Sequence, residues 1–308
     1  MTPPFRIGTR GSRLALWQAN HVAEQLRPLL APREVVLVEL RTTGDQVRDV
    51  SLAAIGGQGV FTKEIQQAVR DGRADLAVHS LKDLPTAPVP GLVLAAVPPR
   101  GPTRDVLIAP RHGRFDNLPR AARVATGSSR RRAQLLHRRP DLHLVDIRGN
   151  VDTRLRKLCT EDLDGLILAQ AGLERLNLAH EVTEVLDPSW MLPAVGQGAL
   201  GLECRADDDE ALAAVRRLNH APSMQAVTAE RAFLRTLGGG CLLPIAALAD
   251  VAGEVLTLTG AVCSPDGRRR LAGTVTGPAA DADALGQELA RRLLAQGARE
   301  LLRDASET

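Results

Sequence analysis

Apolar positions in the first third of the chain follow two spacings, one typical of buried strands and one typical of helices. Short apolar runs rich in β-branched residues lie at 5–9, 34–42, 74–80 and 92–97. Between them, residues 12–30 and 63–72 carry apolar side chains at helical spacing. Strands that alternate with helices in this way predict a parallel sheet of the βαβ kind.

A second series of the same kind follows a break rich in proline and glycine at 98–104. We expect its strands at 105–109, 123–127, 143–148, 164–169 and 200–204. We expect its helices at 130–139, 151–158, 171–176 and 208–218. Near 219–223 the order changes to one helix, several strands and a long C-terminal helix with Leu285, Leu289 and Leu293 one turn apart. The chain is therefore predicted to be an α/β protein with a C-terminal α+β module.

Polar side chains follow the predicted strands at the point where each strand ends. They are Thr9, Arg10 and Ser12, then His79, Ser80, Lys82 and Asp83, then Thr126, Ser128, Arg130 and Arg131, and finally Arg148, Asn150 and Arg154. Because ligands of open α/β sheets bind beyond the carboxyl ends of the strands, we expect these side chains to point outward and to bind an anion. A single arginine cluster is more often a solvated helix face, so only the four clusters together favour an anion site. By itself, His79 is more often a structural histidine, and Asp83 could cap a short helix or pair with Lys82.

Composition argues against several classes of protein. The chain has no apolar run long enough to cross a bilayer and begins without a secretion signal, so we expect a cytoplasmic protein with no membrane partner. Its four cysteines lie far apart and show no CxxC spacing, which argues against a disulfide framework and against a metal site. Only 2% of the residues are aromatic, too few to stack unpaired bases, so we expect no nucleic-acid partner.

Three glycines directly precede Cys241 in the segment LRTLGGGCLLPIA at 234–246, so the backbone before this cysteine carries no side chains. An apolar, strand-like stretch follows at once. By itself, a free cysteine is most often a small buried hydrophobe. The residues alone do not say whether this thiol has a chemical role.

Nine segments spread over almost the whole chain resemble, in order, the porphobilinogen deaminase (hydroxymethylbilane synthase) family. They are TRGSRLALWQ, GVFTKE, ADLAVHSLKDLP, RRRAQL, IRGNVDTRLRKL, LILAQAGLERL, LPAVGQGALGLECR, TAERAFLRTLGGGCLLPIA and GARELL. The resemblance implies two domains of the periplasmic-binding-protein type, with mixed and mainly parallel sheets, and a small third α+β domain. On this chain, the first domain would comprise 1–98 with 199–218, the second 104–194, and the third, which carries the cysteine, 221–308.

The resemblance also implies an activity and a cofactor. Members of the family are transferases of tetrapyrrole and haem biosynthesis that join four porphobilinogen molecules head to tail, with release of ammonia, and then release hydroxymethylbilane by hydrolysis. Their primer is one covalent dipyrromethane, joined by a thioether to the cysteine at the position of Cys241. A thiolate would trap the electrophilic azafulvene that forms when the substrate loses ammonia, and the glycines would leave room for the adduct.

Asp83 matches the family's catalytic aspartate, and Lys82 lies beside it in the sequence. A carboxylate next to the pyrrole N–H would stabilise the cation that deamination leaves and could pass protons as the amine departs. Lys82 would help to keep that carboxylate ionised. Both residues are therefore predicted to be catalytic and to contact the cofactor.

Further positions match the family's binding residues. For the cofactor they are Thr126, Ser128, Arg130, Arg131, Arg148 and Gly172. For the substrate they are Arg10, Ser12, Gln18, Arg148, Asn150, Arg154, Arg175 and Gln197. Each pyrrole ring carries an acetate and a propionate, which suit the planar fork of a guanidinium. We expect a monomer whose partner is the small molecule porphobilinogen.

The chain departs from the family's pattern at a few positions. Gly127 stands where a serine is usual, and Ala54 and Gln58 stand where many relatives have lysine. The segment that holds Ala54 and Gln58 would hold the growing chain less strongly unless Arg48 or Lys63 substitutes. A solute-binding protein would share the two-lobed fold, but it would usually need a signal peptide and would not explain the Gly-Gly-Gly-Cys segment.

Overall fold

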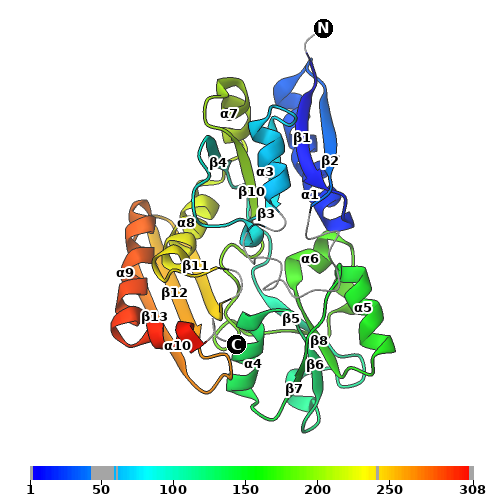
Figure 1. The fold of residues 1–308 in the computed structure, drawn as a ribbon, viewed down its shortest axis with the longest axis vertical. Helices are drawn as coiled ribbons and strands as arrows, with labels where there is room; N and C mark the ends of the chain where they lie inside the picture. Colours follow the sequence, from blue (N-terminus) through cyan, green and yellow to red (C-terminus); the bar gives the residue numbers. More distant parts are fainter. Residues whose placement is uncertain (1–2, 43–58, 60–61, 241–242, 305–308) are drawn as a thin grey trace. The chain divides into compact units, whose positions relative to one another are not determined.

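The computed structural model describes residues 3–42, 59, 62–240 and 243–304. The chain divides into two compact units (Figure 1). The first comprises 1–101 and 199–224, and the second comprises 102–198 and 225–308. The finer division into three domains stays a prediction. None of the helices in the described ranges is long and apolar enough to cross a membrane.

The first unit contains a five-stranded sheet in the order β2-β1-β3-β10-β4. Its strands are β1 (Phe5–Arg10), β2 (Val35–Leu40), β3 (Leu76–Ser80), β4 (Leu92–Ala96) and β10 (Leu200–Arg205). β1 pairs in parallel with β2 and β3, whereas β10 pairs antiparallel with β3 and β4. Only β10, which returns from late in the chain, therefore runs against the other strands of this sheet.

Helices of the first unit bury apolar faces against this sheet. They are α1 (Arg13–Leu30), α3 (Lys63–Arg70), the short 3-10 helix η1 (Leu81–Asp83) and α7 (Asp209–Arg216). Ser12 caps α1, because its side chain accepts the Ala15 N–H at 3.3 Å. Val22 and Leu26 of α1 are fully buried in one core with Phe5 of β1. Capping and packing together fix the start of α1 beside the end of β1.

The second unit contains a five-stranded sheet in the order β7-β6-β8-β5-β9, which repeats the pattern of strand directions of the first sheet with the antiparallel strand again in the fourth place. Its strands are β5 (Asp105–Ile108), β6 (Arg123–Ala125), β7 (His143–Val145), β8 (Gly165–Ala169) and β9 (Glu184–Val185). β6 pairs in parallel with β7 and β8, and β5 pairs antiparallel with β8 and β9. The helices that follow these strands are η2 (Phe115–Asn117), α4 (Ser129–Arg138), α5 (Val151–Thr160), α6 (Gln170–Arg175) and η3 (Ala179–Glu181). The predicted fold class, with mixed and mainly parallel sheets, is confirmed.

A three-stranded antiparallel sheet, β11-β12-β13, forms the rest of the second unit with the C-terminal helices and with α8 from residue 225 onward. These elements are α8 (Ala221–Thr236), β11 (Ile245–Ala252), β12 (Val255–Cys263), β13 (Arg270–Pro278), η4 (Ala279–Asp281), α9 (Ala282–Ala295) and α10 (Ala298–Asp304). Phe233, Leu258 and Leu289 are buried in their common core. The long C-terminal helix predicted from Leu285, Leu289 and Leu293 is α9, and Gly297, with φ +96°, separates it from the short α10.

Candidate functional site

A pocket opens in the first unit where β1 and β3 end. Its polar lining consists of Arg10, Ser12, Gln18, His79, Ser80 and Asp83, with Thr62 before α3. The structure thus brings together four of the predicted site residues, namely Arg10, Ser12, Gln18 and Asp83. Three separate elements contribute them: β1, α1 and η1.

Hydrogen bonds fix the polar wall of this pocket. Gln18 Nε2 donates to Ser80 Oγ at 2.8 Å, and Ser80 Oγ donates to Gln18 Oε1 at 3.1 Å, which joins α1 to the end of β3. The next turn, η1, is anchored by the Leu81 N–H, which donates to Ala199 O at 3.0 Å. Because Leu81 is buried, the half-buried Asp83 side chain is presented from a fixed turn.

The carboxylate of Asp83 is open to a ligand. Within the part of the chain that the structure describes, it forms no hydrogen bond and no ion pair with another side chain. Lys82, its neighbour in the sequence, therefore does not pair with it. An open carboxylate at the wall of a pocket can receive an N–H group of a bound molecule or a positive charge that develops on it.

A buried polar network lies behind this pocket. Glu203 of β10 is 5% exposed and accepts hydrogen bonds from Gln66 Nε2 at 2.9 and 3.2 Å. It also lies 3.2 Å from Nε2 of His79, which is 4% exposed. The expectation that His79 is a hydrogen-bonded, buried histidine is confirmed. Glu203 is not recognisable from the sequence, because its only signal is a charge inside an otherwise apolar strand, 124 positions from His79.

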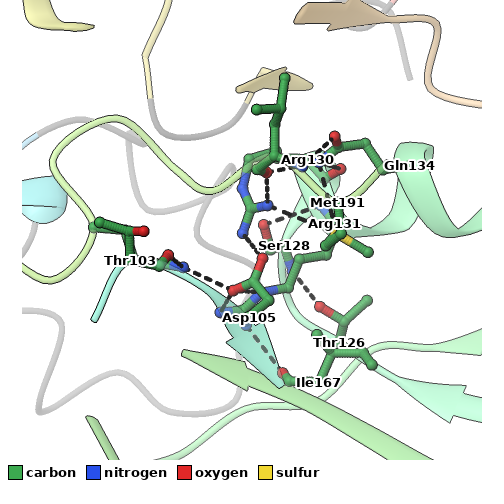
Figure 2. Close-up of polar contacts among 11 residues, drawn as sticks. Thr103, Asp105, Thr126, Ser128, Arg130, Arg131, Gln134, Ile167 and Met191 are labelled. Atoms are coloured by element: carbon green, nitrogen blue, oxygen red, sulfur yellow. Dashed lines mark hydrogen bonds and ion pairs between the residues drawn. The ribbon is translucent and has the colours of Figure 1, made fainter. Parts of the chain in front are cut away.

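Asp105 lies at the centre of a buried cluster in the second unit (Figure 2). Arg130 Nη2 donates to Oδ2 at 2.7 Å, and Arg131 donates to Oδ1 through Nε at 3.1 Å and Nη2 at 2.8 Å. Gln197 Nε2 donates to the same Oδ1 at 2.9 Å and to Thr103 O at 2.7 Å. Three predicted site residues, Arg130, Arg131 and Gln197, therefore converge on one carboxylate.

This cluster keeps its charges although it is buried. Burial alone would raise the pKa of Asp105, but the charges of Arg130 and Arg131, with hydrogen bonds from Arg131 and Gln197, outweigh burial and lower the pKa to about 2. Burial lowers the pKa of Arg130, and the Asp105 charge opposes that shift. Asp105 is therefore ionised at neutral pH, and two guanidinium groups share one negative charge.

Both guanidinium groups point into the unit. Arg130 is 4% exposed and Arg131 is 5% exposed, and they donate further hydrogen bonds to the carbonyls of Leu192 and Ile167. The prediction that the strand ends point these two arginines outward is wrong, because Asp105 holds them inside. The only sequence signal of Asp105 is a charge at the first position of the apolar strand β5. The contact of both arginines with the cofactor stays a prediction.

Helix caps of the second unit hold several other predicted residues. Ser128 caps α4 by accepting the Arg131 N–H at 3.4 Å, and Asn150 caps α5 by accepting a backbone N–H at 2.9 Å. Thr126 is buried, and its Oγ1 accepts the Ser128 N–H at 3.3 Å. Gly172 lies in α6. The hydroxyls of Thr126 and Ser128 thus lie where the helix that carries Arg130 and Arg131 begins.

Three predicted cations are held near carbonyl or carboxylate oxygens of the second unit. Arg148 lies 3.9 Å from a carboxylate oxygen of Asp146, and Arg154 Nε donates to Gly149 O at 2.8 Å. Arg175 Nη2 donates to a backbone carbonyl at 2.6 Å. Burial lowers the pKa of Arg175 to about 10, and the charge of its neighbour Glu174 opposes that shift. Arg175 therefore stays charged at neutral pH.

Gly127 lies between Thr126 and the capping Ser128. A Cβ at this position would lie 2.6 Å from the backbone oxygen of Ile147. Ile147 belongs to the loop that leads to Arg148, so the absence of a side chain lets this loop approach the start of α4 closely. The departure from the family's usual serine therefore has a local packing reason.

Some residues named in the sequence analysis lie outside the described residues: Cys241, Ala54, Gln58 and Arg48. Cys241 lies in the sequence between the end of α8 at Thr236 and the start of β11 at Ile245. Among the residues that are described, no group of three or more histidine, cysteine, aspartate or glutamate side chains could hold a metal ion.

Family models match both parts of the chain. A model described as porphobilinogen deaminase, dipyromethane cofactor binding domain, matches residues 5–213, and one described as the porphobilinogen deaminase C-terminal domain matches residues 224–295. The chain belongs to the porphobilinogen deaminase family. It is therefore a transferase, hydroxymethylbilane synthase by its other name, and its cofactor is dipyrromethane.

Relatives named porphobilinogen deaminase are similar over nearly the whole chain. The protein from Syntrophotalea carbinolica is 53% identical, covering 97% of this chain and 95% of its own. The protein from Pelobacter propionicus is 49% identical, covering 98% of both. Among solved structures, a periplasmic substrate-binding protein of an ABC transporter from Coxiella burnetii is 14% identical, with a TM-score of 0.45, covering 74% of this chain and 96% of that one.

The groups of the Asp105 cluster suit a dipyrromethane whose two rings carry acetate and propionate groups. Two guanidinium groups share a single carboxylate. Arg130 Nε is buried and has no hydrogen-bond partner among the described residues. An excess of buried positive charge with a spare N–H suits a carboxylate ligand, because charge-assisted hydrogen bonds are the strong ones.

Proposed function

We propose that this protein joins four porphobilinogen molecules head to tail on a dipyrromethane held by Cys241. Each addition releases ammonia, and hydrolysis then releases the linear tetrapyrrole hydroxymethylbilane for haem biosynthesis. The observation that carries the proposal is the open carboxylate of Asp83 in a pocket that Arg10 also lines. We also propose a cytoplasmic monomer that has no nucleic-acid or membrane partner.

Asp83 is the proposed catalytic residue. Its carboxylate receives the pyrrole N–H of the substrate and stabilises the positive charge that forms on the ring as the amine leaves. The same oxygens can pass protons when the amine departs and when the ring carbon is later deprotonated. Lys82, next to Asp83 in the sequence, is the second proposed catalytic residue. The hydrogen-bonded pair of Gln18 and Ser80 keeps the wall of the pocket in place.

Cys241 is the proposed point of attachment of the cofactor. When bound, the dipyrromethane supplies the pyrrole carbon to which the first substrate molecule is joined. The thiolate of Cys241 is the nucleophile that forms the thioether. Gly239 and Gly240, which directly precede it, have no side chains that would crowd the sulfur. The match of this segment to the family supports the assignment.

Arginines of both units are proposed to bind the acidic side chains of the rings. Arg10, Arg148, Arg154 and Arg175 bind the substrate, with Ser12, Gln18, Asn150 and Gln197 as neutral partners. Arg130, Arg131 and Arg148 bind the cofactor, with Thr126, Ser128 and Gly172. Because Asp105 already orders Arg130 and Arg131, a carboxylate that meets them avoids the entropy cost of ordering two long side chains.

Intact-mass spectrometry tests the proposed function. We expect the wild-type protein to carry the added mass of one dipyrromethane, and Cys241→Ser to lack both this mass and turnover of porphobilinogen. The exposed Cys159 provides the matched control, so Cys159→Ser should keep both. A wild-type protein that is active at the mass of the bare polypeptide would contradict the role of Cys241.

A further inference from the structure

The buried carboxylate of Glu203 contacts His79, which lines the pocket of the first unit, and it pairs with no arginine or lysine among the described residues. A carboxylate as deeply buried as that of Glu203 is normally paired with arginine or lysine. Within the described ranges of the chain, its side-chain partners are Gln66 and His79. Glu203 therefore contacts the imidazole of His79 instead of an arginine or a lysine, and this contact orients the ring.

Glu203 determines which nitrogen of His79 carries a hydrogen. An ionised carboxylate only accepts hydrogen bonds, and both of its oxygens already accept from Gln66 Nε2. His79 Nε2, 3.2 Å from Glu203 Oε2, is therefore the N–H donor. In the neutral ring, Nδ1 then keeps its lone pair and acts as an acceptor.

This acceptor is left for a ligand. His79 Nδ1 has no hydrogen bond with any residue that the structure describes. The residue lines the pocket together with Ser80 and Asp83. A pocket lined by an imidazole whose Nδ1 has no partner among the described residues, and by an open carboxylate, suits a guest with several N–H groups and a positive charge.

We propose that His79 is a further substrate-binding residue, whose Nδ1 accepts a hydrogen bond from the cationic aminomethyl group of porphobilinogen. Glu203 is the positioning residue that holds the ring. The inference rests on the proposed function, which makes porphobilinogen the substrate. The contact forms and breaks no covalent bond. It places the nitrogen that will depart, while Asp83 stays available for the pyrrole N–H.

Two variants test the roles of the two ring nitrogens of His79 separately. In His79→Gln, the amide nitrogen takes the place of Nε2 and still donates to Glu203, but nothing replaces Nδ1. In His79→Asn, the amide group takes the place of Nδ1, and the contact with Glu203 is lost. We expect His79→Gln to keep its thermal midpoint within a few degrees and to raise KM for porphobilinogen roughly tenfold to hundredfold, the range for a hydrogen bond to a charged group. We expect His79→Asn to lower the thermal midpoint and to raise KM less.

A matched control uses a second histidine–carboxylate pair. His112 Nε2 lies 3.0 Å from Asp164 Oδ1 in the second unit, so His112→Gln should leave KM unchanged. A spectroscopic measurement needs no substrate. Nitrogen-15 spectra of the histidine side chains at pH 8 should show His79, identified by its loss in His79→Gln, as the Nε2–H tautomer. Glu203→Gln should weaken that preference, because an amide can also donate to Nε2.

The outcomes distinguish this proposal from the proposed function. A wild-type KM in His79→Gln, or an Nδ1–H tautomer of His79, would overturn the substrate contact. Parallel losses of thermal stability in both His79 variants, with KM unchanged while both are folded, would also overturn it. Wild-type protein that does not turn over porphobilinogen would instead refute the proposed function, and this is measured before any variant is compared.

Discussion

Asp105→Asn tests whether charge holds the buried cluster of the second unit together. The substitution keeps the shape of the side chain and replaces one oxygen by an amide nitrogen. It removes the only carboxylate that pairs with Arg130 and Arg131 among the described residues. The new amide group also turns a donor toward side chains that are donors themselves. Two buried cations then lie together without a counter-charge.

The size of the cost follows from two considerations. The partners of Asp105 lower its pKa from the model-compound value of 3.8 to about 2, a shift that corresponds to roughly 2–3 kcal/mol. Removing one partner of a buried ion pair costs about 3–5 kcal/mol, because the remaining charge stays buried. We therefore expect a loss of about 3 kcal/mol, or a fall of about 6–12 °C in the thermal midpoint of a unit of this size.

The pH dependence gives an independent prediction. The pKa of Asp105 in the folded protein, about 2, is lower than its unfolded value of 3.8. The unfolded state therefore binds more protons in this range, and the contribution of Asp105 to stability rises with pH. It is complete above about pH 5 and is lost as the pH falls through about 4 toward 2. The difference in stability between wild type and variant should shrink over the same window.

Denaturant unfolding of wild type and variant at several pH values between about 7 and 3 measures both effects. Asp162→Asn is a matched control, because Asp162 forms an exposed ion pair with Arg111 and has a positive φ of 48°, which asparagine tolerates. Exposed pairs contribute little, so the control should unfold like wild type. Equal stability of Asp105→Asn and wild type at pH 7 would refute the electrostatic reasoning.

Two other substitutions test the pocket and the loop contact. Asp83→Asn should lower turnover of porphobilinogen by at least about a hundredfold at an unchanged thermal midpoint; steady-state rates with thermal unfolding check this, and a largely retained rate would move the chemistry to another residue. Gly127→Ser should destabilise the second unit by about 1–3 kcal/mol, because its Cβ would lie 2.6 Å from Ile147 O. Denaturant unfolding measures this loss. If the variant unfolded at the same denaturant concentration as the wild type, the loop at 146–150 would have to move away from the new side chain without loss of stability.

Helices and strands with a regular spacing of apolar residues are predictable from the sequence, because that spacing marks the face that becomes buried. The strand expected at 5–9 is β1 (Phe5–Arg10), and the helix expected at 63–72 is α3 (Lys63–Arg70). β9 (Glu184–Val185) was not predicted, since two residues form no pattern. The break between α9 and α10 was also missed, because the leucine spacing does not reveal that Gly297 adopts a positive φ.

The resemblance to the family implies Arg10, Ser12, Gln18 and Asp83 as site residues, and all four line the pocket, although Asp83 by itself could equally have been a helix cap or a partner of Lys82. Ser12 and Asp83 follow strands directly, and the structure has both at the pocket. Asp105 was missed because its partners are distant in sequence: Gln197 lies 92 positions away. Only the fold brings Asp105 to Arg130 and Arg131. The local sequence around the two arginines therefore predicts exposed cations, although both are buried.

Asp83 and Asp105 show how partners decide what one residue type does. Asp105 is enclosed by two guanidinium groups and an amide, so its lowered pKa makes it a poor proton acceptor and a good structural anchor. No arginine in the described part of the chain pairs with Asp83, which leaves its oxygens open at the pocket. An enzyme whose substrate carries both acid groups and a forming cation needs both arrangements. Because Asp105 rather than Asp83 engages the buried arginines, the cations proposed to bind acidic rings do not neutralise the carboxylate of Asp83, the proposed catalytic residue.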